Sequence, residues 1–268
     1  MPAKLVLYTF AVSHFSEKIR WVLDAAGLHY EERRLIPFFH LLHNRRLTGG
    51  RSSSVPILQV GDEVIADSTR ILLWLERHCY QEIVASGLLP AGRAQRERVL
   101  QIEDRFDRVG AHVIRYIYGF VLDDREEVLK LWGADATLPQ WAVLRASFPL
   151  LRLAFHRGFK VNPLSCARSR RAVGEALDWL EQELADGREF LVGGHLTVAD
   201  VSVCALLAPL ATPPEHLLYC SPRYRDTIRE HTIDWSARPA IEWIRRTYRH
   251  WRYPIAKRYR ELALTTVA

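Results

Sequence analysis

The sequence predicts an α/β domain in residues 1–80 and an all-helical domain in residues 93–268. Up to residue 80, short apolar runs alternate with amphipathic segments, which is the pattern of strands and helices packed in layers. Beyond residue 93, apolar side chains recur at helical spacing. Residues 81–92 contain Pro90-Ala91-Gly92, a stretch typical of loops. We therefore interpret residues 81–92 as a linker.

The predicted order in the first domain is β-α-β-α-β-β-α. Strands are expected at Lys4–Tyr8, His29–Leu35, Val55–Val60 and Glu63–Ile65. Helices are expected over Phe15–Ala26, over Phe38–Leu47 and from Asp67-Ser68 onward. Gly61-Asp62 lies between the last two strands, where a hairpin turn is expected.

The second domain is predicted to contain four main helices. They cover Arg93–Leu122, Arg168–Ala185, Thr197–Leu210 and Ala237–Arg252. The segment 123–165 has a weaker pattern, with short helices expected around Glu126–Trp132 and Gln140–Phe155.

The bulk composition is that of a globular protein. Hydrophobic residues make up 49% of the 268 residues and charged residues 25%, which argues against a disordered chain. No apolar run reaches the ~20 residues that a membrane helix needs, and the first residues lack a signal-peptide pattern. Four scattered cysteines predict free thiols. We therefore expect a cytoplasmic protein. Its net charge of +6 suits anionic small molecules, nucleic acid or a membrane surface, and does not decide between them.

Ser13 and Ser16 lie between a predicted strand and a predicted helix. A serine in this position can simply cap the helix. The same geometry can also serve a site, because the free N–H groups and the dipole of a helix N-terminus stabilise an anion. A hydroxyl that donates to a sulfur would favour the thiolate over the thiol. Both interpretations fit the residues.

Two further motifs have both a structural and a functional interpretation. Val55-Pro56 begins a strand, where an ordinary trans bond is common and a cis bond would expose the main chain of Val55 to a peptide ligand. Asp67-Ser68 can cap the following helix. As a site, Ser68 and the next amides would hold a carboxylate, and Asp67 would accept a hydrogen bond from an ammonium group.

These motifs together resemble the glutathione S-transferase superfamily. The resemblance is carried by S-x-F-S-x-K-x-R from Ser13 to Arg20, by Val55-Pro56-x-Leu58 and by Asp67-Ser68. In the helical half, the stretch from Gly193 to Asp200 resembles the family's capping box. The resemblance implies a thioredoxin-like N-terminal domain that binds glutathione, and a helical C-terminal domain that carries the second-substrate pocket.

The resemblance also implies an enzyme and its site. Glutathione would be the co-substrate, and its thiolate would attack an apolar electrophile. Ser13 would stabilise the thiolate, with Ser16 as the reserve candidate. The tripeptide would be bound by Ser54, Val55, Pro56, Asp67 and Ser68. The resemblance further implies a homodimer. Independently of it, we expect Tyr116 or Tyr118 and Trp residues to line the second pocket.

The sequence departs from the family pattern at two positions. His14 stands where many relatives have Pro, and Asp67 replaces a more usual Glu. No Cys lies near Ser13, which argues against a mixed-disulfide mechanism and for non-covalent thiolate chemistry. These departures leave open a non-catalytic module that binds a ligand or another protein.

Two other patterns lead to weaker hypotheses. The segment Arg245–Tyr253 interleaves cations and aromatic residues as single-strand nucleic-acid binders do, but we favour a terminal helix with its aromatic residues packed inward. His40 and His43 lie three residues apart without an evident third ligand, so no metal is expected. Tyr8 is interpreted as a core or interface residue.

Overall fold

The computed structural model of the chain describes residues 4–216 and 218–254. Its sheet has four strands, in the spatial order β2-β1-β3-β4. The strands are β1 (Leu5–Thr9), β2 (Tyr30–Arg34), β3 (Ile57–Val60) and β4 (Glu63–Ala66). β1 runs parallel to β2 and antiparallel to β3, which pairs with β4 through a two-residue turn. Gly61 in that turn has φ +58°, a conformation that glycine adopts without steric cost.

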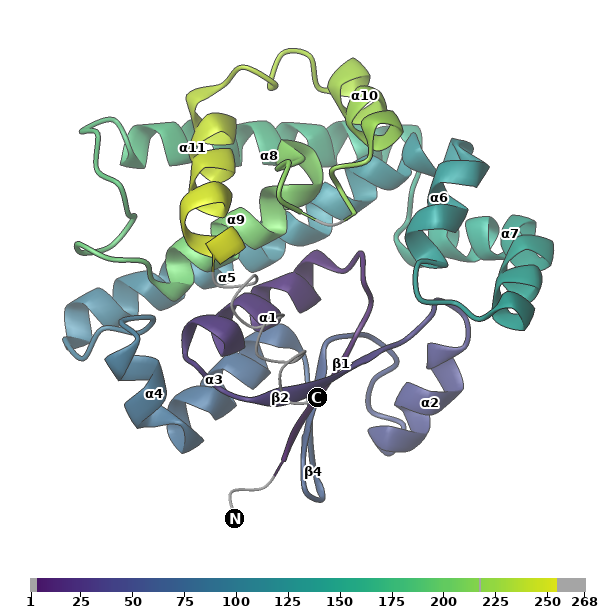
Figure 1. Cartoon of the computed structure of the whole chain (residues 1–268). Helices are drawn as coiled ribbons and strands as arrows, with labels where there is room; N and C mark the ends of the chain where they lie inside the picture. The colour runs from purple at the N-terminus through teal and green to yellow at the C-terminus, as the bar shows by residue number, and fades with distance from the viewer. Residues whose placement is uncertain (1–3, 217, 255–268) are drawn as a thin grey trace.

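Three helices complete the thioredoxin-like unit, and the predicted order of elements is confirmed. They are α1 (His14–Ala25), α2 (His40–Leu47) and α3 (Ser68–His78). α1 and α3 lie between the sheet and the helical half of the molecule, whereas α2 lies outside that layer (Figure 1). α1 is therefore covered on two sides, which agrees with the burial of most of its side chains.

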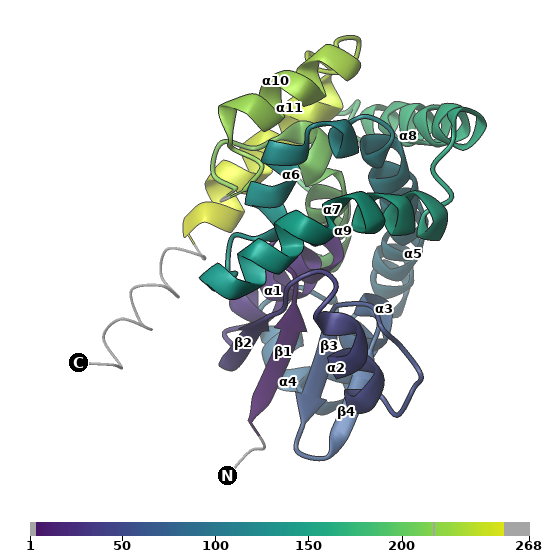
Figure 2. The same ribbon diagram turned by 90° about the vertical axis from the view of Figure 1, so that its right-hand side faces the viewer.

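The remaining elements in the described ranges are helical, as predicted. They are α4 (Tyr80–Ala85), α5 (Arg93–Tyr118), η1 (Val121–Asp123), α6 (Arg125–Trp132), α7 (Leu138–Gly158), α8 (Pro163–Glu183), α9 (Val198–Ala211), α10 (Pro222–His231), α11 (Pro239–Thr247) and the π-helical turn η2 (Tyr248–Arg252). Figure 2 shows these helices stacked on one side of the sheet. None of the helices in the described ranges combines the length and the apolar character needed to cross a membrane.

The structure differs from the sequence prediction in four places. α4 occupies the start of the expected linker, and Leu88 and Leu89 behind it are buried. α5 ends four residues earlier than expected, at a cap on Gly119. The predicted short helix around Gln140–Phe155 is the 21-residue α7. α10 was not predicted, because its two buried residues leave almost no periodic apolar signal. The limits of the two domains stay a prediction.

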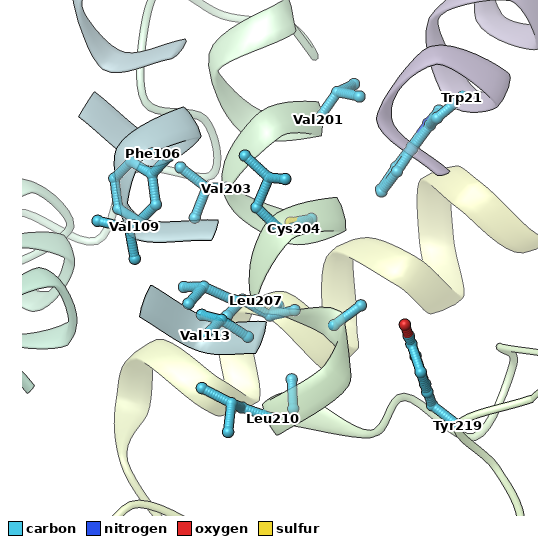
Figure 3. Packing of buried hydrophobic residues seen from close by; sticks show 14 of the residues in the cluster. Trp21, Phe106, Val109, Val113, Val201, Val203, Cys204, Leu207, Leu210 and Tyr219 are labelled. Carbon is cyan, nitrogen blue, oxygen red and sulfur yellow. The ribbon is translucent and has the colours of Figure 1, made fainter. Parts of the chain in front are cut away.

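Helix α9 forms the centre of the helical half, and all of its residues are buried. The predicted capping box is present: the Asp200 carboxylate accepts from the backbone N–H and the hydroxyl of Thr197, both at 2.8 Å. In Figure 3, Val203 and Leu207 of α9 lie beside Phe106 and Val113 of α5. A helix that is apolar all round is stable only when neighbours cover every face, and α1, α5 and α11 all contact α9.

A buried ion network joins the end of the described chain to α1. The Arg252 guanidinium donates to Glu17 and to Asp24, at 2.6 Å in each case. Arg20 also pairs with Glu17, at 2.8 Å. Burial alone would raise the pKa of Glu17, but the charges of Arg252 and Arg20 outweigh it and lower the pKa to about 2. The two arginines therefore keep Glu17 charged inside the protein.

Removing the cation of this network should destabilise the fold. We expect Arg252→Gln to lower the free energy of unfolding by about 3–5 kcal/mol, because the buried carboxylates of Glu17 and Asp24 each lose a cationic partner. Urea denaturation at neutral pH measures the change. The control is Arg171→Gln, which breaks an exposed ion pair with Glu175 on α8 and should have little effect. Equal losses in the two variants would contradict this role for Arg252.

Candidate functional site

The three motifs of the predicted site meet at one edge of the sheet. Tyr8, near the end of β1, pairs with Ile57 at the start of β3, and Ile57 pairs with Ala66 at the end of β4. Ser13 follows β1, Val55-Pro56 precedes β3, and Asp67 follows β4. The antiparallel pairing of β3 with both neighbours therefore places all three motifs at the same end of the strands.

Ser13 and Ser16 differ in accessibility. Ser13 is the N-cap of α1, and its Oγ accepts from the backbone N–H of Ser16 at 3.1 Å. The side chain of Ser13 is half-buried, whereas Ser16 is fully buried. The Ser16 hydroxyl has no hydrogen-bond partner within the described part of the chain. The capping interpretation of Ser13 is confirmed, and the cap leaves its hydroxyl hydrogen free to donate.

The loop between β1 and Ser13 is held by side chains from distant segments. Arg20 donates to the Phe10 carbonyl at 2.6 Å. The Tyr219 hydroxyl donates to the carbonyl of Val12 at 2.5 Å. These bonds fix the chain on the N-terminal side of Ser13, so its hydroxyl is presented from an ordered loop.

His14 and Phe15 attach the start of α1 to α5. The Nε2–H group of His14 donates to the Gly110 carbonyl at 3.1 Å. A side chain on Gly110 would come within 3.0 Å of the Phe15 ring and 3.3 Å of the His14 ring, so the glycine permits this approach. Burial lowers the pKa of His14 to about 4. The residue that departs from the family pattern is thus a neutral contact between helices.

The Val55-Pro56 peptide bond is cis. The Pro56 carbonyl accepts from the backbone N–H of Asp67 at 3.3 Å. Behind the bond, the Asn44 side chain of α2 donates to the Ser54 carbonyl at 3.3 Å. Ser54 is exposed and Val55 is half-buried. The main chain before β3 is therefore held from both sides, with Ser54 and Val55 at the surface.

Asp67 and Ser68 begin α3 as the sequence predicted. Asp67 has φ +91°, is exposed, and caps α3 by accepting from the Arg70 N–H at 3.0 Å. Ser68 is buried, and its hydroxyl donates to the Asp107 carboxylate of α5 at 3.2 Å. Asp67 therefore faces solvent, whereas Ser68 is already engaged within the protein.

The sequence interpretation missed a cluster on α5. The Lys18 ammonium of α1 is fully buried and lies 2.5 Å from Glu103 and 2.8 Å from Asp107. Glu103 also accepts from the Thr69 hydroxyl of α3 at 2.8 Å. The cluster joins the starts of α1 and α3 through α5. It carries no sequence signal, because acidic residues on a long helix are also typical of a solvated face.

Several other predicted residues have structural partners. Tyr116 is buried and donates its hydroxyl to the His231 carbonyl at 2.7 Å, and Tyr118 packs edge-on against Phe155. Tyr8 is buried and donates to Gln59, as a core residue would. Residues 4–216 and 218–254 contain no group of three or more His, Cys, Asp or Glu placed to hold a metal ion.

The basic segment is buried in part and exposed in part. In Arg245–Tyr253, Tyr248 and Arg252 are buried, and Arg249 pairs with Glu215 at 3.1 Å. The aromatic ring of Trp251 contacts Phe190. Tyr248 agrees with the favoured interpretation of aromatic residues packed inward, whereas Trp251 and Tyr253 are exposed.

Both halves of the chain match models of the same protein family. Residues 7–81 match the model of the glutathione S-transferase N-terminal domain, and residues 166–263 match that of the glutathione S-transferase C-terminal domain. Among curated proteins, none matches the chain.

Solved structures with the same fold cover most of the chain. Human glutathione transferase theta-2, in complex with glutathione and an unknown ligand, is 20% identical, with 92% of this chain and 90% of that one covered and a TM-score of 0.54. A glutathione S-transferase from Methylobacillus flagellatus with glutathione bound is 15% identical, with 90% and 98% covered and a TM-score of 0.54. The β-etherase LigF from Sphingobium is 20% identical, with 90% and 98% covered and a TM-score of 0.56.

The buried His14 should make stability depend on pH. Its pKa of about 4 in the folded state lies below the ordinary 6.5. Its contribution is therefore fully present above pH 6.5 and is lost as the pH falls toward 4, because the unfolded chain binds the proton more tightly. We expect the loss of unfolding free energy between pH 7 and pH 5 to be smaller by about 2 kcal/mol in His14→Gln.

Urea denaturation at both pH values measures this difference. The control is His250→Gln, which replaces an exposed histidine. The same pH dependence in His14→Gln and in the unmodified protein would show that His14 does not carry the effect.

Proposed function

Because the chain belongs to the glutathione S-transferase superfamily, we propose that it binds glutathione and promotes attack of the thiolate on an apolar electrophile. The observation that carries this proposal is the meeting of Ser13, Val55-Pro56 and Asp67-Ser68 at one edge of the sheet. Each motif has a different chemical capacity: a hydroxyl donor, an edge of main chain and an anion-binding helix start. A thiol tripeptide with a free amino acid end needs all three.

Ser13 is the proposed thiolate stabiliser. Its Oγ accepts the Ser16 N–H and retains a hydrogen to donate. The sulfur would lie near the N-terminus of α1, where the helix dipole favours negative charge. Ser16 remains the reserve candidate, but its complete burial supports Ser13.

The γ-glutamyl end is proposed to bind at the start of α3. Its carboxylate would accept from Ser68 and the following amides, and its ammonium would lie beside Asp67. Asp107, with its side chain 27% exposed, adds a second carboxylate on the ammonium side. Lys18 lies 2.8 Å from Asp107 on the buried side and is shared with Glu103. Ser68 would exchange its bond to Asp107 for one to the ligand.

The cysteinyl part is proposed to pair with the main chain of Val55, next to Pro56. Ser54 is exposed beside it and is a weaker candidate contact. The electrophile would enter from the helical half, opposite the sheet edge. We also propose a homodimer, which light scattering at several protein concentrations would test.

Titration calorimetry with glutathione tests the proposal first. It is done in two buffers of different ionisation enthalpy, so that the number of protons released is measured. Binding with proton release supports uptake of the thiolate. Binding without proton release, together with no turnover of nitro-activated aryl halides, epoxides or enones, would favour the non-catalytic module. Absence of binding would contradict the proposal.

Ser13→Ala should lower kcat about a hundredfold or more and change the glutathione Kd little, because one hydrogen bond to the developing charge is lost. Stopped-flow spectroscopy of the bound thiolate, near its ultraviolet absorption, gives an independent readout. The matched variant is Ser16→Ala, which removes the buried hydroxyl three residues later. Full activity of Ser13→Ala and loss of activity in Ser16→Ala would move the assignment to Ser16.

Ser68→Ala should mainly weaken glutathione binding, by about tenfold, because a hydrogen bond to a charged group is lost. Calorimetry measures the Kd and steady-state kinetics measure kcat, which should change much less. Ser147→Ala serves as the control, because this half-buried serine of α7 bonds only within its own helix. A large fall in kcat at unchanged Kd would argue against a binding role for Ser68.

A further inference from the structure

A cavity of about 300 Å³ lies in the helical half, outside the candidate site. It is enclosed by the C-terminal end of α9, by α10, by the segment after α10 and by α11. Its lining combines the apolar residues Leu210, Ile228, Trp235 and Ile241 with charged residues of α10 and α11. In Figure 1, α10 and α11 lie at the far side of the helices from the sheet. Ser13, Val55-Pro56 and Asp67-Ser68 do not line this cavity.

The cavity has an apolar floor. Leu210, Ile228, Trp235 and Ile241 are all buried, with at most 5% of each exposed. Two hydroxyl groups of the wall donate within the protein: Thr232 donates to the Ile228 carbonyl at 2.7 Å, and Ser236 donates to the Ile233 carbonyl at 3.0 Å. The floor therefore offers contact area to an apolar group of a ligand. The Thr232 hydroxyl is already bonded within the protein and would not bind that ligand.

The guanidinium of Arg245, which lines the cavity, is held by hydrogen bonds to backbone carbonyls rather than by a close ion pair with a carboxylate. Its Nε donates to the carbonyl of Ala211, the last residue of α9, at 2.8 Å, and Nη1 donates to Ser236 at 3.2 Å. The carboxylate of Glu242 is 3.9 Å away. Burial lowers the pKa of Arg245 below its usual range; the carboxylate of Glu242 partly offsets this shift, and the positive charge of Arg225 adds to it. The guanidinium thus carries a positive charge that its surroundings compensate poorly.

Arg225 adds a second cation of the same kind. Within residues 4–216 and 218–254, its side chain makes no hydrogen bond or ion pair. Arg229, one turn later on α10, pairs with Asp226 at 2.7 Å. The lining therefore contains three arginines and one acidic residue, which is itself paired. An anion in the cavity would relieve the repulsion between Arg225 and Arg245.

We propose that this cavity binds a small amphipathic anion, an aromatic or aliphatic carboxylate whose apolar body lies on the floor. The planar guanidinium of arginine matches a carboxylate with two parallel hydrogen bonds. The volume is at the lower end of small-ligand pockets, so a one- or two-ring acid or a medium-chain fatty acid has a suitable size. This site is separate from the proposed glutathione site and does not depend on it.

The probe is naphthalene-2-carboxylate, titrated into the full chain by calorimetry while the fluorescence of Trp235 and the other tryptophans is followed. Arg225→Gln should weaken binding at least tenfold. The matched control is Arg246→Gln, which removes the same charge from an exposed neighbour on α11 that does not line the cavity, and it should change the affinity less than twofold. Arg245 also donates to the carbonyls of Ala211 and Ser236. The second variant is therefore Arg245→Lys, which keeps the positive charge, rather than Arg245→Gln.

Two further measurements separate this cavity from the thiol site. Saturating glutathione should leave the affinity for the probe unchanged, and naphthalene-2-methanol, which has the same rings without the charge, should bind at least tenfold more weakly. The proposal is overturned if the unmodified protein does not bind the carboxylate, if Arg225→Gln and Arg246→Gln bind alike, if the alcohol binds as well, or if glutathione displaces the probe.

Discussion

Helix α1 carries five ionisable side chains into the interior, and every one of them requires a partner on another segment. They are His14, Glu17, Lys18, Arg20 and Asp24. An uncompensated buried charge costs several kcal/mol. The fold meets this requirement with α5, with β2 and with the π-helical turn at Arg252. The partners come from both halves of the chain, so the half that contains the sheet and the helical half can form their contact only in one orientation.

This requirement explains why a motif that suggests chemistry is mainly structural. In the stretch from Ser13 to Arg20, His14 holds α5, Lys18 bridges two carboxylates of α5, and Arg20 holds the loop after β1. Only Ser13 combines a half-exposed side chain with a free hydroxyl hydrogen. Buried ion pairs of this kind add little net stability compared with apolar side chains, but they define which helix faces which. The position of the Ser13 hydroxyl depends on how α1 packs against these helices.

Helix α9 connects the two regions to which we assign ligands. It packs against α5 and against α1, the helix that begins after Ser13. Its C-terminal end contributes Leu210 to the cavity between α10 and α11. Because it is buried on every side, it provides a rigid support for both. The two regions differ in the charge they present: carboxylates of α5 lie behind the start of α3, whereas arginines surround the cavity.

The sequence alone determined the order of elements in the thioredoxin-like unit, the helical nature of the rest and the capping box of α9. These features depend on local periodicity and on caps, which neighbouring residues encode. It also identified Ser13, Val55-Pro56 and Asp67-Ser68 as one group through their resemblance to a family. It could not show that Ser16 is buried, that Ser68 is bound to Asp107, or that Arg225 and Arg245 share a cavity. Each of these depends on contacts between residues far apart in the chain. Only the packing of α1 and α3 against α5, and of α10 and α11 against α9, brings those residues together.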